Sequence, residues 1–139
     1  MTREIKFRSW DKKNKLFITN DEYMIGLDGK FYRMDFYSGI SGYEDGNLIW
    51  NELKDIILMQ YTGLKDKNGK EMYEGDIVKI MQETKTFFDK VIYDNHLCSF
   101  RFEGLSDYCD FCDWLREGAE FEVVGNIYKN PELIGGEND

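Results

Sequence analysis

Four residues in the second half of the chain have the types and the spacing of a metal site. His96 and Cys98 stand two residues apart, and Cys109 and Cys112 form a C-x-x-C pair. Three thiolates and one imidazole are a ligand set that binds zinc in tetrahedral geometry. His96 and Cys98 would share one face of a strand, because side chains alternate along a strand. The sequence therefore contains one candidate zinc site.

Other features of the sequence weigh against that site. Cys112 falls on an apolar stripe with Phe111 and Leu115, where a small buried thiol is ordinary. The C-x-x-C pair lies within a predicted helix rather than in a tight turn, and no second C-x-x-C or H-x₃₋₅-H pattern supports it. A chain of 139 residues also buries enough surface to fold without a metal. We therefore expect no metal ion and no other cofactor.

Few residues of the sequence have the type and spacing that catalysis requires. General acid–base catalysis most often uses His, and the one His in the sequence, His96, falls in a predicted hairpin turn with no nucleophile motif beside it. The segment 39–42 lacks the Gly-Lys-Ser/Thr ending of a phosphate-binding loop. Asp107, Asp110 and Asp113 could hold Mg²⁺, but carboxylates at this spacing are more often the solvated face of a helix. We expect no enzymatic activity.

The charge of the chain restricts its partners. The chain has 27 acidic and 18 basic residues and a formal net charge of −9. Binding of nucleic acid depends on Lys and Arg that displace counterions, so we expect no nucleic-acid partner. Residues 1–20 are basic, whereas residues 103–122 hold seven acidic side chains and one base, Arg116. That acidic segment supports an alternative, an inhibitor that imitates nucleic acid toward a host nucleic-acid-binding protein.

The composition indicates a folded cytoplasmic protein. Apolar residues make up 42% of the chain and aromatic residues 16%, which excludes general disorder. The longest aliphatic run, residues 56–59, is too short to span a membrane, and the charged start does not resemble a signal peptide. Three cysteines, an odd number, are typical of free thiols in a reduced compartment. We expect no membrane association.

Alternation of apolar and polar residues predicts strands along most of the chain. Residues 11–14, 28–29, 68–69 and 94–95 are expected to be hairpin turns, and Asp28-Gly29 and Asn68-Gly69 suit tight type I′ turns with both residues at positive φ. Residues 37–47, with three glycines, are expected to be a loop. Gly125 interrupts the last strand and predicts a bulge.

One segment has helical periodicity. Tyr108, Phe111, Cys112 and Leu115 follow the spacing of an amphipathic helix near residues 107–117, with Ser106 as its N-cap. A second helical turn is expected from Asn130, with Pro131 at its first position; these assignments favour a mainly β fold with a minor α part. We expect a bent antiparallel sheet or small SH3-like barrel, with an N-terminal β-meander and one short helix.

Four segments of the sequence match a known family pattern in chain order. They are residues 3–11 (REIKFRSWD), 59–69 (MQYTGLKDKNG), 73–78 (YEGDIV) and 124–133 (VGNIYKNPEL). Together they resemble the YopX family of small proteins from phages and prophages of Gram-positive bacteria, whereas residues 94–120 match no pattern. The resemblance implies a phage-encoded protein that works in the host cytoplasm. It implies no catalytic residues.

The expected domain organisation is one YopX-like domain over residues 1–134. It would comprise an N-terminal β-meander lobe, 1–62, and a C-terminal barrel-like lobe, 63–134, followed by a disordered tail, 135–139. We expect a non-catalytic protein-interaction module whose partner is a phage or host protein or a second copy of the chain. A small zinc-binding protein remains the third alternative.

The candidate binding residues combine aromatic groups with charges of both signs. They are Arg8, Trp10, Asp11, Lys12, Tyr61, Asp66 and Tyr73. Strand alternation places Arg8 and Trp10 opposite an Ile5/Phe7 core face, which would leave Trp10 exposed as a binding anchor. The alternative is that Trp10 covers the end of the sheet as a lid.

Overall fold

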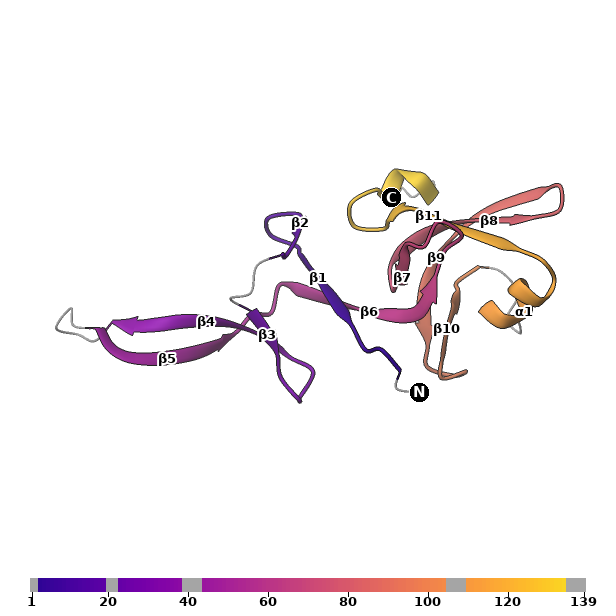
Figure 1. The fold of residues 1–139 in the computed structure, drawn as a ribbon. Coiled ribbons are helices and arrows are strands. Elements are labelled where there is room, and N and C mark those ends of the chain that lie inside the picture. Colours follow the sequence, from indigo (N-terminus) through magenta and orange to yellow (C-terminus); the bar gives the residue numbers. More distant parts are fainter. Residues whose placement is uncertain (1–2, 20–22, 39–43, 105–109, 135–139) are drawn as a thin grey trace. The chain divides into compact units, whose positions relative to one another are not determined.

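The computed structural model describes residues 3–19, 23–38, 44–104 and 110–134, with only the backbone described between 35 and 50. The elements, in chain order, are β1 (Phe7–Asp11), β2 (Leu16–Phe17), β3 (Tyr23–Ile25), β4 (Phe31–Ser38), β5 (Glu44–Glu52), β6 (Ile56–Lys65), β7 (Glu71–Tyr73), β8 (Asp76–Gln82), β9 (Lys85–Asp94), β10 (Ser99–Phe102), α1 (Phe111–Arg116), β11 (Glu120–Asn126) and the 3₁₀ helix η1 (Pro131–Ile134) (Figure 1). No helix among these residues is long and apolar enough to cross a membrane.

The strands form three antiparallel sheets, one of them curled into a half-barrel, which confirms the predicted mainly β class. Their strand orders are β2-β1-β6-β7, β10-β9-β8-β11 and β3-β4-β5. The chain divides into two compact units: unit 1 comprises Met1–Arg8 and Met59–Asp139, and unit 2 comprises Ser9–Leu58. Unit 2 contains the β3-β4-β5 meander, and the predicted tail, 135–139, lies outside the described residues.

The core of unit 1 lies between the sheet β10-β9-β8-β11 and helix α1. The strand β8 is central, and its residues Ile77, Val78 and Ile80 are completely buried. Phe102, Phe111 and Phe121 meet edge to face, with ring centroids 4.8 to 5.9 Å apart. Burial of this much apolar and aromatic surface is the main force that holds the sheet curled over α1.

The predicted hairpins are present, but two of their turns differ from the expected type. Gly29 and Gly69 have φ values of 78° and 84°, whereas Asp28 and Asn68 do not have positive φ. The amide of Gly69 donates to the Asp66 carbonyl at 3.0 Å, as in a type I turn followed by a left-handed glycine. The prediction of type I′ turns was therefore wrong. The carboxylate of Asp66 accepts the amides inside the loop and favours the longer turn.

The predicted loop over residues 37–47 was also wrong. Strand β4 continues through Ser38, and β5 begins at Glu44, with these two residues paired. A register shift between Phe36 and Ser38 accommodates this pairing. Residues 39–43 lie outside the described residues. The glycines weaken the strand pattern in the sequence, but the long hairpin pairs its backbone groups nonetheless.

Helix α1 is shorter than predicted and presents a different face to the core. Its N-cap is Asp110, whose carboxylate accepts the amide of Asp113 at 3.0 Å, while the Asp113 carboxylate accepts the amide of Asp110. This capping box starts the helix later than the predicted cap at Ser106, which lies outside the described residues. Phe111 is buried, but Cys112 and Leu115 of the predicted stripe are exposed. The predicted helical turn with Pro131 at its first position is confirmed as the 3₁₀ helix η1, and the bulge at Gly125 is also confirmed.

Candidate functional site

The predicted zinc ligands do not share a strand face. His96 and Cys98 lie in the turn between β9 and β10, where the carboxylate of Asp94 accepts the amides of His96 (2.8 Å) and Leu97 (3.2 Å). The expected placement on one strand was wrong, because this side-chain cap forms a turn that continues through Cys98. Cys109 lies outside the described residues. In the part of the chain that the structure describes, no group of three or more His, Cys, Asp or Glu could hold a metal ion.

Trp10 is buried rather than exposed. Only 5% of Trp10 is accessible, whereas Ile5 and Phe7, the predicted core face, are 59% and 44% exposed. The indole packs edge to face on the ring of Phe17, 4.9 Å away between centroids. The predicted alternation is present, but its two faces were assigned the wrong way round: Trp10 is buried and Arg8 is half-buried, whereas Ile5 and Phe7 are exposed, and Ser9 is buried as well. Burial removes the argument for Trp10 as an exposed anchor and fits its alternative as a lid.

Most of the other predicted binding residues support local structure. Tyr61 and Asp66 are buried, and Asp11 accepts the amides of Lys13 and Asn14 in its own turn. Burial acts to raise the pKa of Asp66, but hydrogen bonds from three backbone amides, that of Val123 first, bring this pKa below its usual value. Lys12 is exposed. The predicted residues come from both units, and we do not treat them as one surface.

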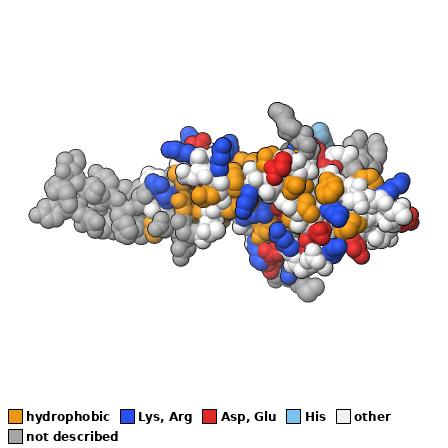
Figure 2. All heavy atoms as spheres, turned by 90° about the horizontal axis from the view of Figure 1, so that it is seen from above, with side chains coloured by type: hydrophobic (Ala, Val, Ile, Leu, Met, Phe, Trp, Pro, Cys, Tyr) orange, Lys and Arg blue, Asp and Glu red, His pale blue; other side chains and the backbone are white. Residues whose placement is uncertain are grey.

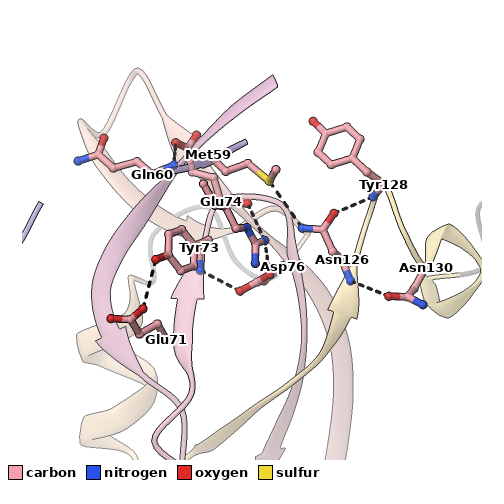
Figure 3. Close-up of polar contacts among 10 residues, drawn as sticks. Met59, Gln60, Glu71, Tyr73, Glu74, Asp76, Asn126, Tyr128 and Asn130 are labelled. Atoms are coloured by element: carbon pink, nitrogen blue, oxygen red, sulfur yellow. Dashed lines mark hydrogen bonds and ion pairs between the residues drawn. The ribbon is translucent and has the colours of Figure 1, made fainter. Parts of the chain in front are cut away.

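Arg8 and Asp76 form the centre of a polar cluster in unit 1, defined here as Arg8, Tyr73, Glu74, Asp76 and Asn126 (Figure 3). Asp76 is 1% exposed, and its carboxylate accepts hydrogen bonds from the Arg8 guanidinium and from the Tyr73 amide, the latter at 2.8 Å. The guanidinium carbon of Arg8 lies 4.7 Å from the centre of the Tyr73 ring. A buried carboxylate held by a cation and an amide is a structural ion pair.

The other half of the polar cluster joins β6 to the end of β11. The carboxylate of Glu74 accepts the amide of Gln60 at 2.9 Å. Asn126 is buried; its carbonyl oxygen accepts the amide of Tyr128 at 2.9 Å, and its amide nitrogen points to the sulfur of Met59 (Figure 3). Burial raises the pKa of Tyr128. These contacts join β6 to the turn between β7 and β8 and to the end of β11.

Gly75 lies at the middle of the polar cluster, where the space left by its neighbours is too small for a side chain. Its φ is 84°, and a Cβ atom would come within 3.3 Å of both the Asn126 side-chain nitrogen and the Met59 sulfur. Its amide donates to Val91 and its carbonyl accepts the amide of Ile127, each at 2.9 Å. A glycine is required by both the backbone conformation and the close packing.

A second set of charged residues lies beside the polar cluster, just before β1 and on β7. The ammonium group of Lys6 contacts the carboxylates of Glu4 and Glu71, each at 2.5 Å, and these hydrogen bonds raise the pKa of Lys6. The same contact with Lys6 lowers the pKa of Glu71. Burial, followed by the nearby Glu71 charge, raises the pKa of Tyr73. The shift of Lys6 arises from its contacts with both carboxylates, that of Glu71 from its contact with Lys6, and that of Tyr73 mainly from burial.

The sequence segments 3–11, 73–78 and 124–133, quoted above for their family resemblance, supply the residues of the polar cluster. Asp76, Glu74 and Asn126 each have hydrogen-bond partners within the protein, and Glu74 also lies at the edge of an open surface. We conclude that this part of the resemblance reflects mainly the fold.

Unit 1 has an open groove of about 610 Å³ beside the polar cluster. Its lining combines apolar, acidic and thiol groups, namely Arg3, Gln60, Thr62, Leu64, Glu74, Tyr93, Cys98, Ser99, Phe100, Asp110, Phe111 and Cys112. The volume is within the range of known ligand sites. One wall is the face of β6 that carries Gln60, Thr62 and Leu64, and the other is formed by β9, β10 and the start of α1.

The chemistry of the groove suits binding. Tyr93 is 43% exposed and stacks edge to face on Phe100, with centroids 5.2 Å apart. Asp110 and Glu74 place carboxylates at the groove, and Arg3 is the one base among the lining residues of the described chain. On the face drawn in Figure 2, basic, acidic and hydrophobic side chains of the described residues are interspersed rather than separated into poles. Such mixed surfaces are typical of protein interfaces.

The sequence did not reveal the groove. Its residues come from separate segments between Arg3 and Cys112, and only the alternation of Gln60, Thr62 and Leu64 marks one wall. The opposite wall falls largely within residues 94–120, which match no pattern of the family.

Comparisons with known proteins agree with this architecture. The family described as YopX protein matches residues 6–135. The structure of protein EF1440 from Enterococcus faecalis is similar with a TM-score of 0.59 and 24% identity, over 96% of this chain and 99% of that one. The structure of yopX from Bacillus subtilis is similar with a TM-score of 0.58 and 20% identity, over 95% of this chain and 97% of that one. Comparison with curated protein sequences finds no match.

Proposed function

Because the chain belongs to the YopX family, we propose that it is a phage-encoded, non-catalytic protein-binding module of the bacterial host cytoplasm, and that its partner occupies the groove of unit 1. The observation that carries this proposal is the groove itself. It is open, it exposes Tyr93 beside Phe100, and it places the carboxylates of Glu74 and Asp110 around an apolar floor. Exposed aromatic groups with a few charges are the usual anchors of protein interfaces.

The arrangement of ionisable groups supports a non-catalytic role. Asp110 caps helix α1, and the Glu74 carboxylate accepts the Gln60 amide, so both acids of the groove have structural partners. The thiol of Cys98 is 3.7 Å from the Asn95 carbonyl oxygen. General acid–base or nucleophilic catalysis needs a nucleophile held against a base, and these contacts do not provide that arrangement.

The resemblance of the sequence segments to phage and prophage proteins supports the phage origin. Cys98 and Cys112 are free and exposed, which fits the reduced interior of a cell better than an oxidising compartment.

The alternative of nucleic-acid mimicry receives less support from the acidic segment. Such mimicry needs a display of unneutralised carboxylates. Within residues 103–122, Glu103 pairs with Lys90, Glu122 contacts Lys67, and Asp113 contacts Arg116. These charges stabilise local structure.

Site-specific photocrosslinking tests the proposal. A benzophenone amino acid is introduced at Tyr93, in the groove, or at Phe88, an equally exposed position on the same strand but outside the groove. In Gram-positive host cells, we expect the Tyr93 variant to form a discrete protein adduct and the Phe88 variant to form none. When cell lysate is irradiated in 0.5 M salt, the Tyr93 adduct should still form, because an apolar anchor is insensitive to screening. Equal adducts at both positions, or no Tyr93 adduct in lysate irradiated at this salt concentration, would overturn the proposal.

A further inference from the structure

Strand β10 is at the edge of its sheet. In the order β10-β9-β8-β11, β10 pairs with β9 on one side, and no other described strand pairs with its outer side. An outer edge of this kind presents backbone donors and acceptors to another strand. Ser99 and Phe100 are half-buried, whereas Arg101 and Phe102 are buried, so the accessible part of this edge is its first half.

The register identifies the groups that point outward. The amide of Glu103 donates to the Lys90 carbonyl, so the pair Glu103 and Lys90 is hydrogen-bonded in the ladder. Because hydrogen-bonded and non-hydrogen-bonded pairs alternate in an antiparallel sheet, the pair Phe100 and Tyr93 is of the other kind. The N–H and C=O of Phe100 therefore point away from β9, to the outer edge.

The same residue joins this edge to the groove. Phe100 and its neighbour Ser99 line the groove, and the ring of Phe100 contacts Tyr93 there. A strand laid beside β10 would place alternate side chains over the apolar lining of Leu64, Phe100 and Phe111. The edge and the groove thus form one continuous surface.

The charge at this surface selects the partner. Glu74 and Asp110 contribute carboxylates from two sides of the groove, Arg3 is its one base among the described residues, and the whole chain carries a net charge of −9. A partner segment with Lys or Arg side chains would therefore be attracted and oriented, whereas an acidic segment would be repelled.

We infer that the groove of unit 1 binds an extended protein segment that pairs with the outer edge of β10, inserts alternate apolar side chains into the groove and places basic side chains at Glu74 and Asp110. This inference rests on the proposed function, and it specifies the conformation and charge of the ligand. Backbone pairing supplies affinity, and the groove supplies selectivity.

The test uses a phage-displayed library of random twelve-residue peptides, selected on the intact protein. We expect enriched peptides to alternate apolar and basic residues. Synthetic copies of the best peptide should lose at least about tenfold in affinity when alternate backbone nitrogens are methylated, because methylation removes the donors of a strand ladder. The same copies with Glu in place of Lys or Arg should not bind.

Matched charge variants locate the peptide. The double variant Glu74→Gln and Asp110→Asn removes both carboxylate charges but keeps an acceptor at each position, and Asn remains a good helix cap. We expect it to weaken peptide binding about fivefold or more. The double variant Glu83→Gln and Glu120→Gln changes the same net charge at exposed positions outside the groove and should bind as the parent does.

The outcomes separate the two proposals. Peptides that bind the groove but tolerate N-methylation, or that are acidic, would overturn the inference while leaving protein binding in the groove in place. Selection of no peptide, together with a crosslinked partner at Tyr93, would also overturn it, because the groove would then bind the surface of a folded protein rather than an extended segment. Selection of no peptide and no crosslink at Tyr93 would overturn both.

Discussion

The polar cluster and the groove lie side by side in unit 1 and are built in opposite ways. In the polar cluster, Asp76 is almost fully buried, and its carboxylate accepts hydrogen bonds from a cation and from an amide. In the groove, Tyr93 is exposed, and the outer edge of β10 has no described strand beside it. The segments most easily recognised in this sequence therefore stabilise the fold, whereas seven of the twelve residues that line the groove come from elsewhere.

The largest expected effect is at the centre of the polar cluster. Asp76→Ala should lower the free energy of unfolding by about 3–5 kcal/mol, because it leaves the Arg8 guanidinium without its carboxylate and the Tyr73 amide without its acceptor. Urea denaturation followed by circular dichroism measures the change. Glu83→Ala, at an exposed position, is the control and should change it by less than about 0.5 kcal/mol. A loss below about 1 kcal/mol for Asp76→Ala would show that the polar cluster contributes little to the stability of the fold.

Two glycines separate packing from backbone strain. Gly75 and Gly69 share a φ of 84°, but a Cβ atom would be crowded at Gly75 and would meet nothing within 4 Å at Gly69. Gly69→Ala should cost about 1–2 kcal/mol from strain alone. Gly75→Ala should cost more, by about 1 kcal/mol, since Asn126 or Met59 must move. Equal losses in denaturant titrations would show that the polar cluster is not tightly packed.

The pH dependence of stability should arise from carboxylates with structural partners. A hydrogen bond from Arg101, at 2.6 Å, is the main cause that lowers the pKa of Asp94, and the pKa of Asp66 is also lowered. A depressed folded pKa stabilises the protein above the unfolded value, near pH 4, and this contribution is lost as the pH falls through the folded value. Thermal melts should therefore show a falling midpoint below about pH 4.

The variant Asp94→Asn tests the source of this pH dependence. It should lower the melting temperature at pH 7, because Arg101 loses its charged partner. The difference from the parent should narrow at pH 3, where the parent carboxylate also becomes protonated. A difference that stays constant between pH 3 and pH 7 would assign the effect to something other than ionisation of Asp94.

The smallest effect on stability is expected in the groove. Tyr93→Ala removes one edge-to-face contact with Phe100 and should change the free energy of unfolding by no more than about 1 kcal/mol. It should nonetheless abolish the crosslinking partner's copurification with the protein, whereas Phe88→Ala should retain it. If Tyr93→Ala unfolds the protein, the groove belongs to the core and the comparison fails.

Local features of the fold were predictable from the sequence. Hairpins at Gly29, Gly69 and Asp94, the bulge at Gly125 and the helical start at Pro131 each depend on residues within a few positions of one another. Features that depend on distant partners were not predictable. Arg8 contacts the buried Asp76, 68 positions away, so the strand face that carries Arg8 and Trp10, which the sequence pattern assigned to solvent, is the buried one.

The groove was beyond prediction for the same reason. Its walls meet only after β6, β9, β10 and α1 are assembled. In the sequence, its acidic residue Asp110 cannot be distinguished from an ordinary residue at the start of a helix. The chemistry of single residues was recognised, but their proximity requires the fold.

The division of the chain has a consequence for its synthesis. Unit 1 takes its first strand residues from the N-terminus and the rest from residue 59 onward, so unit 2 is inserted into it. As the ribosome extends the chain, Lys6 and Arg8 emerge early, yet their partners Tyr61, Glu71 and Asp76 emerge more than 50 residues later. At about 5–20 residues per second, the first strand waits several seconds without its partners. Unit 2 emerges in full during this wait, so the nascent chain can form its hairpins there before unit 1 closes.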